Sequence, residues 1–82
     1  MDIVKGQIVC SNAGHDDGQF FIVIDVKDSF VYLADGKERK LDAPKKKNFK
    51  HIAKTNTIVE IPKSDKGLRK LLSNFRRVNQ ED

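Results

Sequence analysis

The stretch Gln19-Phe20-Phe21-Ile22-Val23-Ile24-Asp25-Val26 decides the fold class of this 82-residue chain. Its β-branched and aromatic residues favour a strand, and the run is too short and too clearly bounded for a core helix. Side chains alternate between the two faces of a strand. One face therefore carries Phe20, Ile22, Ile24 and Val26, and the other carries Phe21, Val23 and Asp25. Apolar residues on both faces predict a wrapped sheet with a cover on its outer side.

Four further strands are expected around this one. They are shorter runs bounded by turn-forming residues, at residues 7–11, 30–33, 37–41 and 57–61. The dipeptide Asp35-Gly36 is suited to a two-residue hairpin, because both positions can take positive φ. Small all-β folds close a short sheet on itself, which removes exposed edges. We therefore expect a mainly β fold, a small five-stranded barrel of the SH3-like type, over residues 1–62.

The last part of the chain reads as one amphipathic helix over residues 63–79, followed by a polar tail at 80–82. Ser64 or Asp65 is suited to be its N-cap. Its apolar side chains fall at helical spacing: Leu68, Leu71, Leu72, Phe75 and Val78. This helix is the expected cover for the outer face of the sheet.

Charge is unevenly placed along the chain. Sixteen Lys and Arg stand against 12 Asp and Glu, a net charge of +4, and the excess lies between residues 37 and 54. A localised basic zone is typical of a site for a polyanion such as RNA. The alternative is a solvated, lysine-rich loop that serves solubility.

A resemblance to the KOW motif lies at residues 6–19, Gly-Gln-Ile-Val-Cys-Ser-Asn-Ala-Gly-His-Asp-Asp-Gly-Gln. Gly6, Gly14 and Gly18 stand at the family's glycine positions. Ile8 stands at its apolar anchor, where it is expected to fill the barrel. The likeness extends through Asp-Gly at 35–36 and Pro-Lys-Lys-Lys-Asn at 44–48, so it covers roughly residues 2–61. The chain is similar to stand-alone prokaryotic KOW proteins, which are related to large-subunit ribosomal proteins of archaea and eukaryotes. This resemblance implies an SH3-like barrel that binds RNA, typically on the ribosome. One departure is the acidic loop His-Asp-Asp at 15–17, where many KOW loops are basic.

The candidate RNA-binding residues combine the glycine loop with the basic zone. They are Gly14, His15, Gly18, Lys37, Arg39, Lys40, Lys45, Lys46, Lys47, Asn48, Lys50 and His51. Lysines neutralise phosphates, and Phe49 either stacks on an unpaired base or fills the core beneath the loop. A secondary basic cluster is expected on the helix, at Arg69, Lys70, Arg76 and Arg77. The alternatives are purely structural. Lys37, Arg39 and Lys40 would protect a strand edge by their charge, and the cations of the helix would interact favourably with its dipole.

The sequence offers little to catalysis. Cys10 is the only cysteine, so no internal disulfide forms, and no motif places a general base beside it. His15, Asp16 and Asp17 are adjacent in a loop and give no fixed metal geometry. Hence we expect no enzyme activity, no metal and no cofactor. No secretory signal and no apolar run near the ~20 residues of a membrane span are present, which favours a cytoplasmic location without a membrane partner.

The expected function is that of a non-catalytic RNA-binding protein associated with the ribosome. Its expected partner is RNA, above all ribosomal RNA, with ribosomal or transcription proteins as further partners. The alternative is a protein-interaction adaptor of the translation or transcription machinery, since SH3-like barrels also dock peptides. A groove for proline-rich peptides needs clustered aromatics, and this chain has no Trp and a single Tyr, Tyr32.

Overall fold

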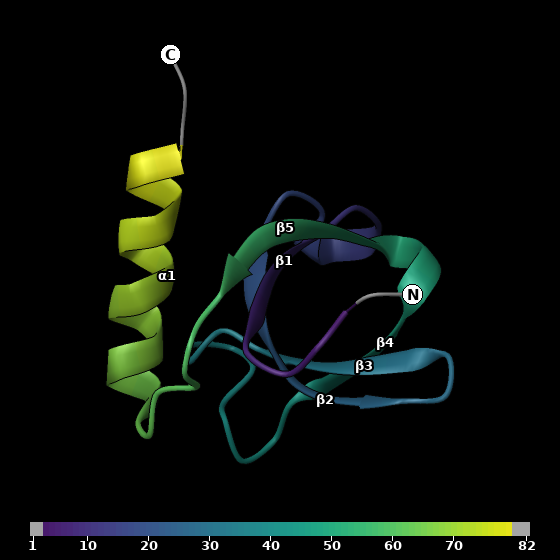
Figure 1. Ribbon diagram of the computed structural model, residues 1–82, viewed down its shortest axis with the longest axis horizontal. Coiled ribbons are helices and arrows are strands. Elements are labelled where there is room, and N and C mark those ends of the chain that lie inside the picture. Colours follow the sequence, from purple (N-terminus) through teal and green to yellow (C-terminus); the bar gives the residue numbers. More distant parts are fainter. Residues whose placement is uncertain (1–2, 80–82) are drawn as a thin grey trace.

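The computed structural model describes residues 3–79, so the expected polar tail at 80–82 lies outside the described residues. The fold is mainly β, as expected: a five-stranded antiparallel sheet followed by one C-terminal helix (Figure 1). The strands are β1 Gln7–Ser11, β2 Phe20–Lys27, β3 Phe30–Ala34, β4 Lys45–Asn48 and β5 Ile52–Ile58, and the helix is α1 Asp65–Asn79. Two 3₁₀ turns, η1 Gly14–Asp16 and η2 Phe49–His51, follow β1 and β4. The order in the sheet is β4-β3-β2-β1-β5.

The sheet curls, so that β1 and β5 lie across from β2, β3 and β4 in Figure 1. The first core fills the inside of this curl and consists of buried Ile3, Val9, Phe21, Val23, Val31, Leu33 and Ile52. Phe49 packs against this core from η2. Of the two roles left open for Phe49, the structure therefore shows the core role.

A second core lies on the outer face of the sheet, beneath α1. It joins Ile8, Ile22 and Ala34 of the sheet to Leu68 and Leu72 of the helix. The helix is thus the cover that the two apolar faces of β2 predicted. It packs on the outer face of the sheet, at the left of Figure 1. Ile8 belongs to this second core and not to the inside of the curl, where its neighbour Val9 lies instead.

A bulge in β2 changes the expected alternation. Val23 pairs with Leu33, but the next pair joins Asp25 to Tyr32, so β2 carries one extra residue between them. An extra residue reverses the faces that follow it. As a result, Val26 packs against the first core and does not share the outer face with Phe20.

Residues 37–41 do not form the expected fourth strand. The carboxylate of Asp35 accepts hydrogen bonds from the backbone N–H groups of Lys37 and Arg39, both at 2.9 Å. Because these two N–H groups are hydrogen-bonded within the loop, they cannot pair with a neighbouring strand. Asp side chains commonly compete with regular secondary structure in this way. Asp35-Gly36 consequently opens a long loop to β4 and is not a two-residue hairpin.

The place beside β3 is taken by β4, a segment expected to be a basic loop. The strand after it is Ile52–Ile58, while the sequence predicted residues 57–61. Hydrophobic periodicity is weak in these two edge strands, because the inward positions of β4 are lysines and most residues of β5 are exposed or half-buried.

The helix begins where its capping chemistry places it. The Ser64 hydroxyl accepts a hydrogen bond from the backbone N–H of Gly67 at 3.0 Å, which makes Ser64 the N-cap. Asp65 is the first helical residue, and its carboxylate accepts from the backbone N–H of Leu41 at 2.8 Å. The start of α1 is therefore tied to the loop that follows β3.

Candidate nucleic-acid interface

Strand β4 divides the lysine tract between two faces of the sheet. Lys45 pairs with Leu33 and Lys47 with Val31, so both lysines point to the inside of the curl. Lys46 pairs with Tyr32 and is exposed on the outside. Three consecutive lysines that the sequence predicts as one basic loop thus serve two different purposes.

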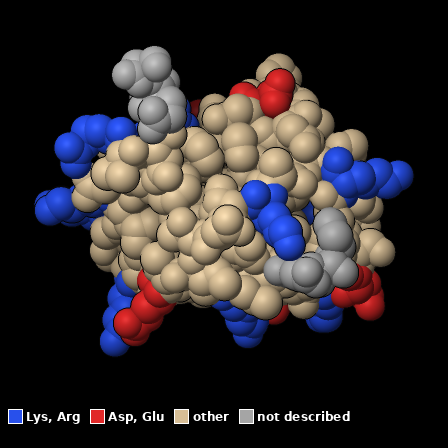
Figure 2. Space-filling model, turned by 45° about the horizontal axis from the view of Figure 1, so that its top comes forward, with Lys and Arg blue, Asp and Glu red and all other residues tan. Residues whose placement is uncertain are grey.

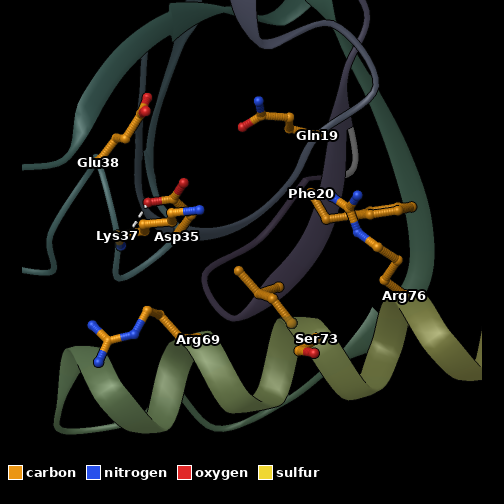
Figure 3. Close-up of a pocket in the computed structure, with 9 residues that line it drawn as sticks. Gln19, Phe20, Asp35, Lys37, Glu38, Arg69, Ser73 and Arg76 are labelled. Carbon is orange, nitrogen blue, oxygen red and sulfur yellow. Dashed lines mark hydrogen bonds between the residues drawn. The ribbon is translucent and has the colours of Figure 1, made fainter.

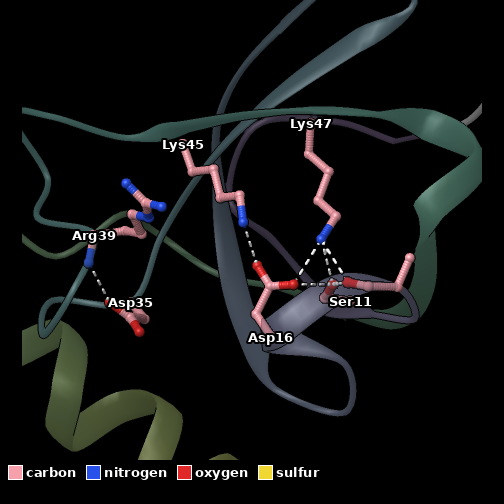
Figure 4. Close-up of polar contacts among 7 residues, drawn as sticks. Ser11, Asp16, Asp35, Arg39, Lys45 and Lys47 are labelled. Carbon is pink, nitrogen blue, oxygen red and sulfur yellow. Dashed lines mark hydrogen bonds and ion pairs between the residues drawn. The ribbon is translucent and has the colours of Figure 1, made fainter.

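Lys47 is buried, and its ammonium group donates hydrogen bonds to three acceptors. These are the Ser11 hydroxyl at 2.7 Å, the Ala13 carbonyl at 3.0 Å and the Asp16 carboxylate at 2.7 Å. The other oxygen of Asp16 accepts from Lys45 at 2.8 Å, and Figure 4 shows both lysines converging on this carboxylate. An ammonium group has only three protons to donate, so Lys47 has none left for a phosphate.

Asp16 is ionised by its surroundings. Burial raises the pKa of its carboxyl, but hydrogen bonds from Lys45, Lys47 and Ser11 outweigh this and hold the pKa well below the usual range for Asp. The acidic glycine loop, which departs from the KOW pattern, is therefore an anchor between η1 and β4. Lys47 uses its three donors within this buried ion pair, which leaves none for the predicted RNA contact, whereas Lys45 is half-buried beside it and remains a predicted RNA contact.

The glycine loop itself is closed by its own backbone. Gly18 donates to the carbonyl of Ser11 at 2.7 Å, and Asp17 donates to that of Gly14 at 3.2 Å. Gly14 and Gly18 both have positive φ, as a tight loop of this kind requires. Both glycines and His15 are exposed, and they remain on the surface next to the Asp16 anchor.

The outer side of β3 and β4 carries two aromatic side chains beside a lysine. Phe30 and Tyr32 are half-buried, and the Lys46 ammonium lies 4.3 Å from the centroid of the Phe30 ring. We call Phe30, Tyr32 and Lys46 the β3–β4 face. Lys27 of β2 pairs with Phe30, which adds a second exposed lysine at its border.

Sequence reasoning missed the two aromatics of the β3–β4 face. The sequence did contain a signal for them. Alternation along β3 puts Phe30 and Tyr32 on one face of the strand and the apolar Val31 and Leu33 on the other. Asn48 pairs with Phe30 across β4, but its side chain caps the next turn by accepting from the backbone N–H of Lys50 at 3.0 Å.

The other candidate residues of the basic zone lie at the two ends of β4. Lys37, Arg39 and Lys40 are exposed on the loop before it, and Lys50 and His51 are exposed on η2 after it. A four-residue strand is about 10–13 Å long, which separates the two groups. The structure thus divides the predicted patch into two parts flanking β4.

The cations of the helix do not form one cluster. Arg69 donates to the carbonyl of Gly36 at 2.7 Å, and the Arg76 guanidinium lies 5.6 Å from the centroid of the Phe20 ring. Both line a groove of about 360 Å³ between α1 and the loop at residues 35–38 (Figure 3). Arg77 bonds to Asn74 of its own helix at 2.9 Å, and neither Arg77 nor the exposed Lys70 lines this groove.

Charged side chains are scattered over the face shown in Figure 2. Most Lys and Arg side chains project from its edges, one lies near its middle, and most of the area between them is uncharged. Among residues 3–79, no helix is long and apolar enough to cross a membrane, and no three His, Cys, Asp or Glu gather as a metal site requires.

No protein-family model matches the chain, and no curated protein matches it either.

Proposed function

We propose that this chain is a non-catalytic RNA-binding protein that holds a single-stranded segment of RNA on the β3–β4 face. The observation that carries the proposal is the pairing of two half-exposed aromatic rings with an exposed lysine on one sheet surface. Bases stack on aromatic side chains, with about 1–3 kcal/mol per base, while lysines neutralise the phosphates between them. The exposed Lys50 and His51 on η2 extend this surface beyond the end of β4.

The fold that we propose is an SH3-like barrel of the KOW type. Support comes from the five antiparallel strands in the order β4-β3-β2-β1-β5 and from the apolar core inside their curl. Further support is the glycine loop between β1 and β2, whose glycines take positive φ. From the KOW resemblance we propose ribosomal RNA as the partner and the cytoplasm as the location.

Cys10, the single cysteine of the chain, is poorly suited to act as a nucleophile. Burial raises the pKa of its thiol, and the nearby charge of Asp17 raises it further, against the opposing effect of Arg76. A thiol with a raised pKa is uncharged at neutral pH and is a poor nucleophile.

The test is the salt dependence of binding to a fluorescent single-stranded RNA, measured by anisotropy. We expect Lys46→Gln to flatten the plot of log K against log salt by about 0.7, the loss of one phosphate contact on a single strand. Tyr32→Leu keeps most of the side-chain bulk but removes the ring, and it should weaken binding by about 1–3 kcal/mol. Lys63→Gln removes an exposed lysine from the segment before α1 and is the matched control.

Two results would contradict the proposal. One is the absence of salt-sensitive RNA binding by the folded wild-type protein, and the other is an equal effect of Lys46→Gln and Lys63→Gln. The ribosomal part is tested separately by sedimentation of lysate through a sucrose gradient. We expect the protein to travel with a ribosomal subunit and to be released by ribonuclease or high salt. A protein that stays at the top of every gradient is not ribosome-associated, and the ribosomal part of the proposal is then wrong.

A further inference from the structure

The outer side of α1, away from the sheet, carries three cations in a line. Lys66, Lys70 and Arg77 are exposed, and none of them lines the groove of Figure 3. At about 100° per residue they fall within a sector of about 40° on the helix, opposite the buried Leu68 and Leu72. Lys and Arg side chains project from the left edge of Figure 2, the side on which α1 lies in Figure 1. We call Lys66, Lys70 and Arg77 the helix stripe.

The helix stripe has no negative charge to balance it. Asp65 is the only acid within Asp65–Asn79, and its carboxylate accepts a hydrogen bond from the backbone N–H of Leu41, in the loop after β3. Within residues 3–79, no Asp or Glu forms an ion pair with a cation of the helix stripe. Its positive charge is therefore left to solvent or to a partner.

The fold does not explain two of these cations. Lys66 lies in the first turn of α1, where the positive end of the helix dipole disfavours a cation. Lys66 and Lys70 stand four residues apart, and like charges at this spacing destabilise a helix. Only Arg77, in the last turn, is placed favourably for the dipole. Because Lys66 and Lys70 weaken the helix that carries them, their charge indicates an external anion.

The chemistry of the helix stripe suits a nucleic-acid backbone whose bases are paired. Within Asp65–Asn79 the one aromatic residue is Phe75, and it packs against the second core on the opposite side of the helix. Unpaired bases stack on aromatic side chains, whereas an RNA duplex presents phosphates and 2′-hydroxyls. Basic amphipathic helices also bind membrane surfaces, but they do so by burying an apolar side that α1 has already buried on the sheet.

We infer that the helix stripe binds the phosphate backbone of a double-stranded stretch of RNA. This inference rests on the proposed RNA-binding function and names the partner more closely, as an RNA stem joined to a single-stranded segment. The two surfaces are well separated. Phe20, which packs beneath α1, is the first residue of β2, and Lys27, at the border of the β3–β4 face, is the last. Seven steps along a strand correspond to about 23 Å.

The test measures the salt dependence of binding to two probes, a blunt RNA duplex and an oligo(U) strand of equal length. The double variant Lys66→Gln with Lys70→Gln should flatten the plot of log K against log salt by about 1.8 on the duplex, at about 0.9 for each lost phosphate contact. Its binding to oligo(U) should be unchanged. Lys46→Gln, on the β3–β4 face, is the matched control and should affect oligo(U) but not the duplex.

The melting temperature of the free protein gives a second readout. The double variant should melt a few degrees higher than wild type, because it removes the cation of the first turn and the repulsion between the two lysines. A lower melting temperature would show that these lysines stabilise the fold, which contradicts the inference.

The binding outcomes separate this inference from the proposed function. If wild type binds oligo(U) but the double variant retains full duplex binding, the helix stripe is not a site and RNA binding stands. Equal losses on both probes also overturn the inference, since they indicate attraction by net charge alone. Binding to phosphatidylserine vesicles without duplex binding would make the partner a membrane, and the inference is then wrong. If the folded wild-type protein binds neither RNA, both the inference and the proposed function are wrong.

Discussion

Replacing Asp16 by Ala is expected to lower the free energy of unfolding by about 3–5 kcal/mol, the cost of leaving a buried charge without its partner. The Lys47 and Asp16 side chains are only 9% and 11% exposed, so water cannot replace the lost carboxylate at the ammonium group. Lys45 loses its 2.8 Å contact in the same variant. Chemical denaturation at neutral pH measures the change.

Two further variants show whether the buried charge is the cause. Asp17→Ala changes an exposed acid in the same loop and should alter stability by less than about 0.5 kcal/mol. The double variant Asp16→Ala with Lys47→Met removes both charges, and it should recover part of the loss, because an apolar pair tolerates burial. If the double variant is less stable than Asp16→Ala alone, the stranded ammonium is not the source of the effect.

The same carboxylate makes stability depend on pH in a defined direction. The pKa of Asp16 is lower in the folded protein than in the unfolded chain, where it is about 3.9. Its contribution is therefore fully present above the unfolded value and is lost as the pH falls below about 4. We expect a steeper acid loss of stability in wild type than in Asp16→Ala, and parallel curves would contradict this linkage.

Gly36→Ala is expected to destabilise the protein by about 2–5 kcal/mol, as the sum of two effects. The φ of Gly36 is +79°, a left-handed conformation that costs a residue with a Cβ about 1–2 kcal/mol. The added Cβ would also overlap the backbone carbonyl oxygen of Asp65 and lie 3.2 Å from the backbone nitrogen of Arg69. Overpacking against backbone of this kind typically adds about 1–3 kcal/mol.

Gly18→Ala separates these two effects. Gly18 has nearly the same φ, +86°, but its Cβ would meet no atom within 4 Å. Thermal unfolding should therefore show the conformational cost alone for Gly18→Ala, and a clearly larger loss for Gly36→Ala. Equal losses would mean that close packing of the loop on α1 is not what requires glycine at position 36.

The sequence predicts those elements whose apolar side chains repeat at a regular interval. β1 lies at its predicted residues 7–11, and β2 and α1 differ from their predicted ranges by one or two residues. β4 was missed because its lysines have low strand preference and its pairing with β3 depends on distant residues. The loop at 37–41 was predicted as a strand because alternation there is unrelated to burial; the Asp35 carboxylate decides its shape.

The candidate site shows a similar limit. A sequence gives the number of lysines in the tract at residues 45–51, but not the face of the sheet on which each one lies. Only the register of β4 against β3 sends Lys47 inward to Asp16, 31 residues away in the chain, and Lys46 outward to Phe30. The groove was equally hidden, because Phe20, Glu38 and Arg76 are brought together only when α1 packs on the sheet.

The second core makes the helix inseparable from the sheet as a folding unit. A fragment ending at residue 62 would uncover Ile8, Ile22 and Ala34 on the outer face of three neighbouring strands. Such a surface invites self-association, so the fragment would be prone to aggregate instead of remaining a smaller working module. Fusion tags and reporters are for that reason better placed after α1 than between the sheet and the helix.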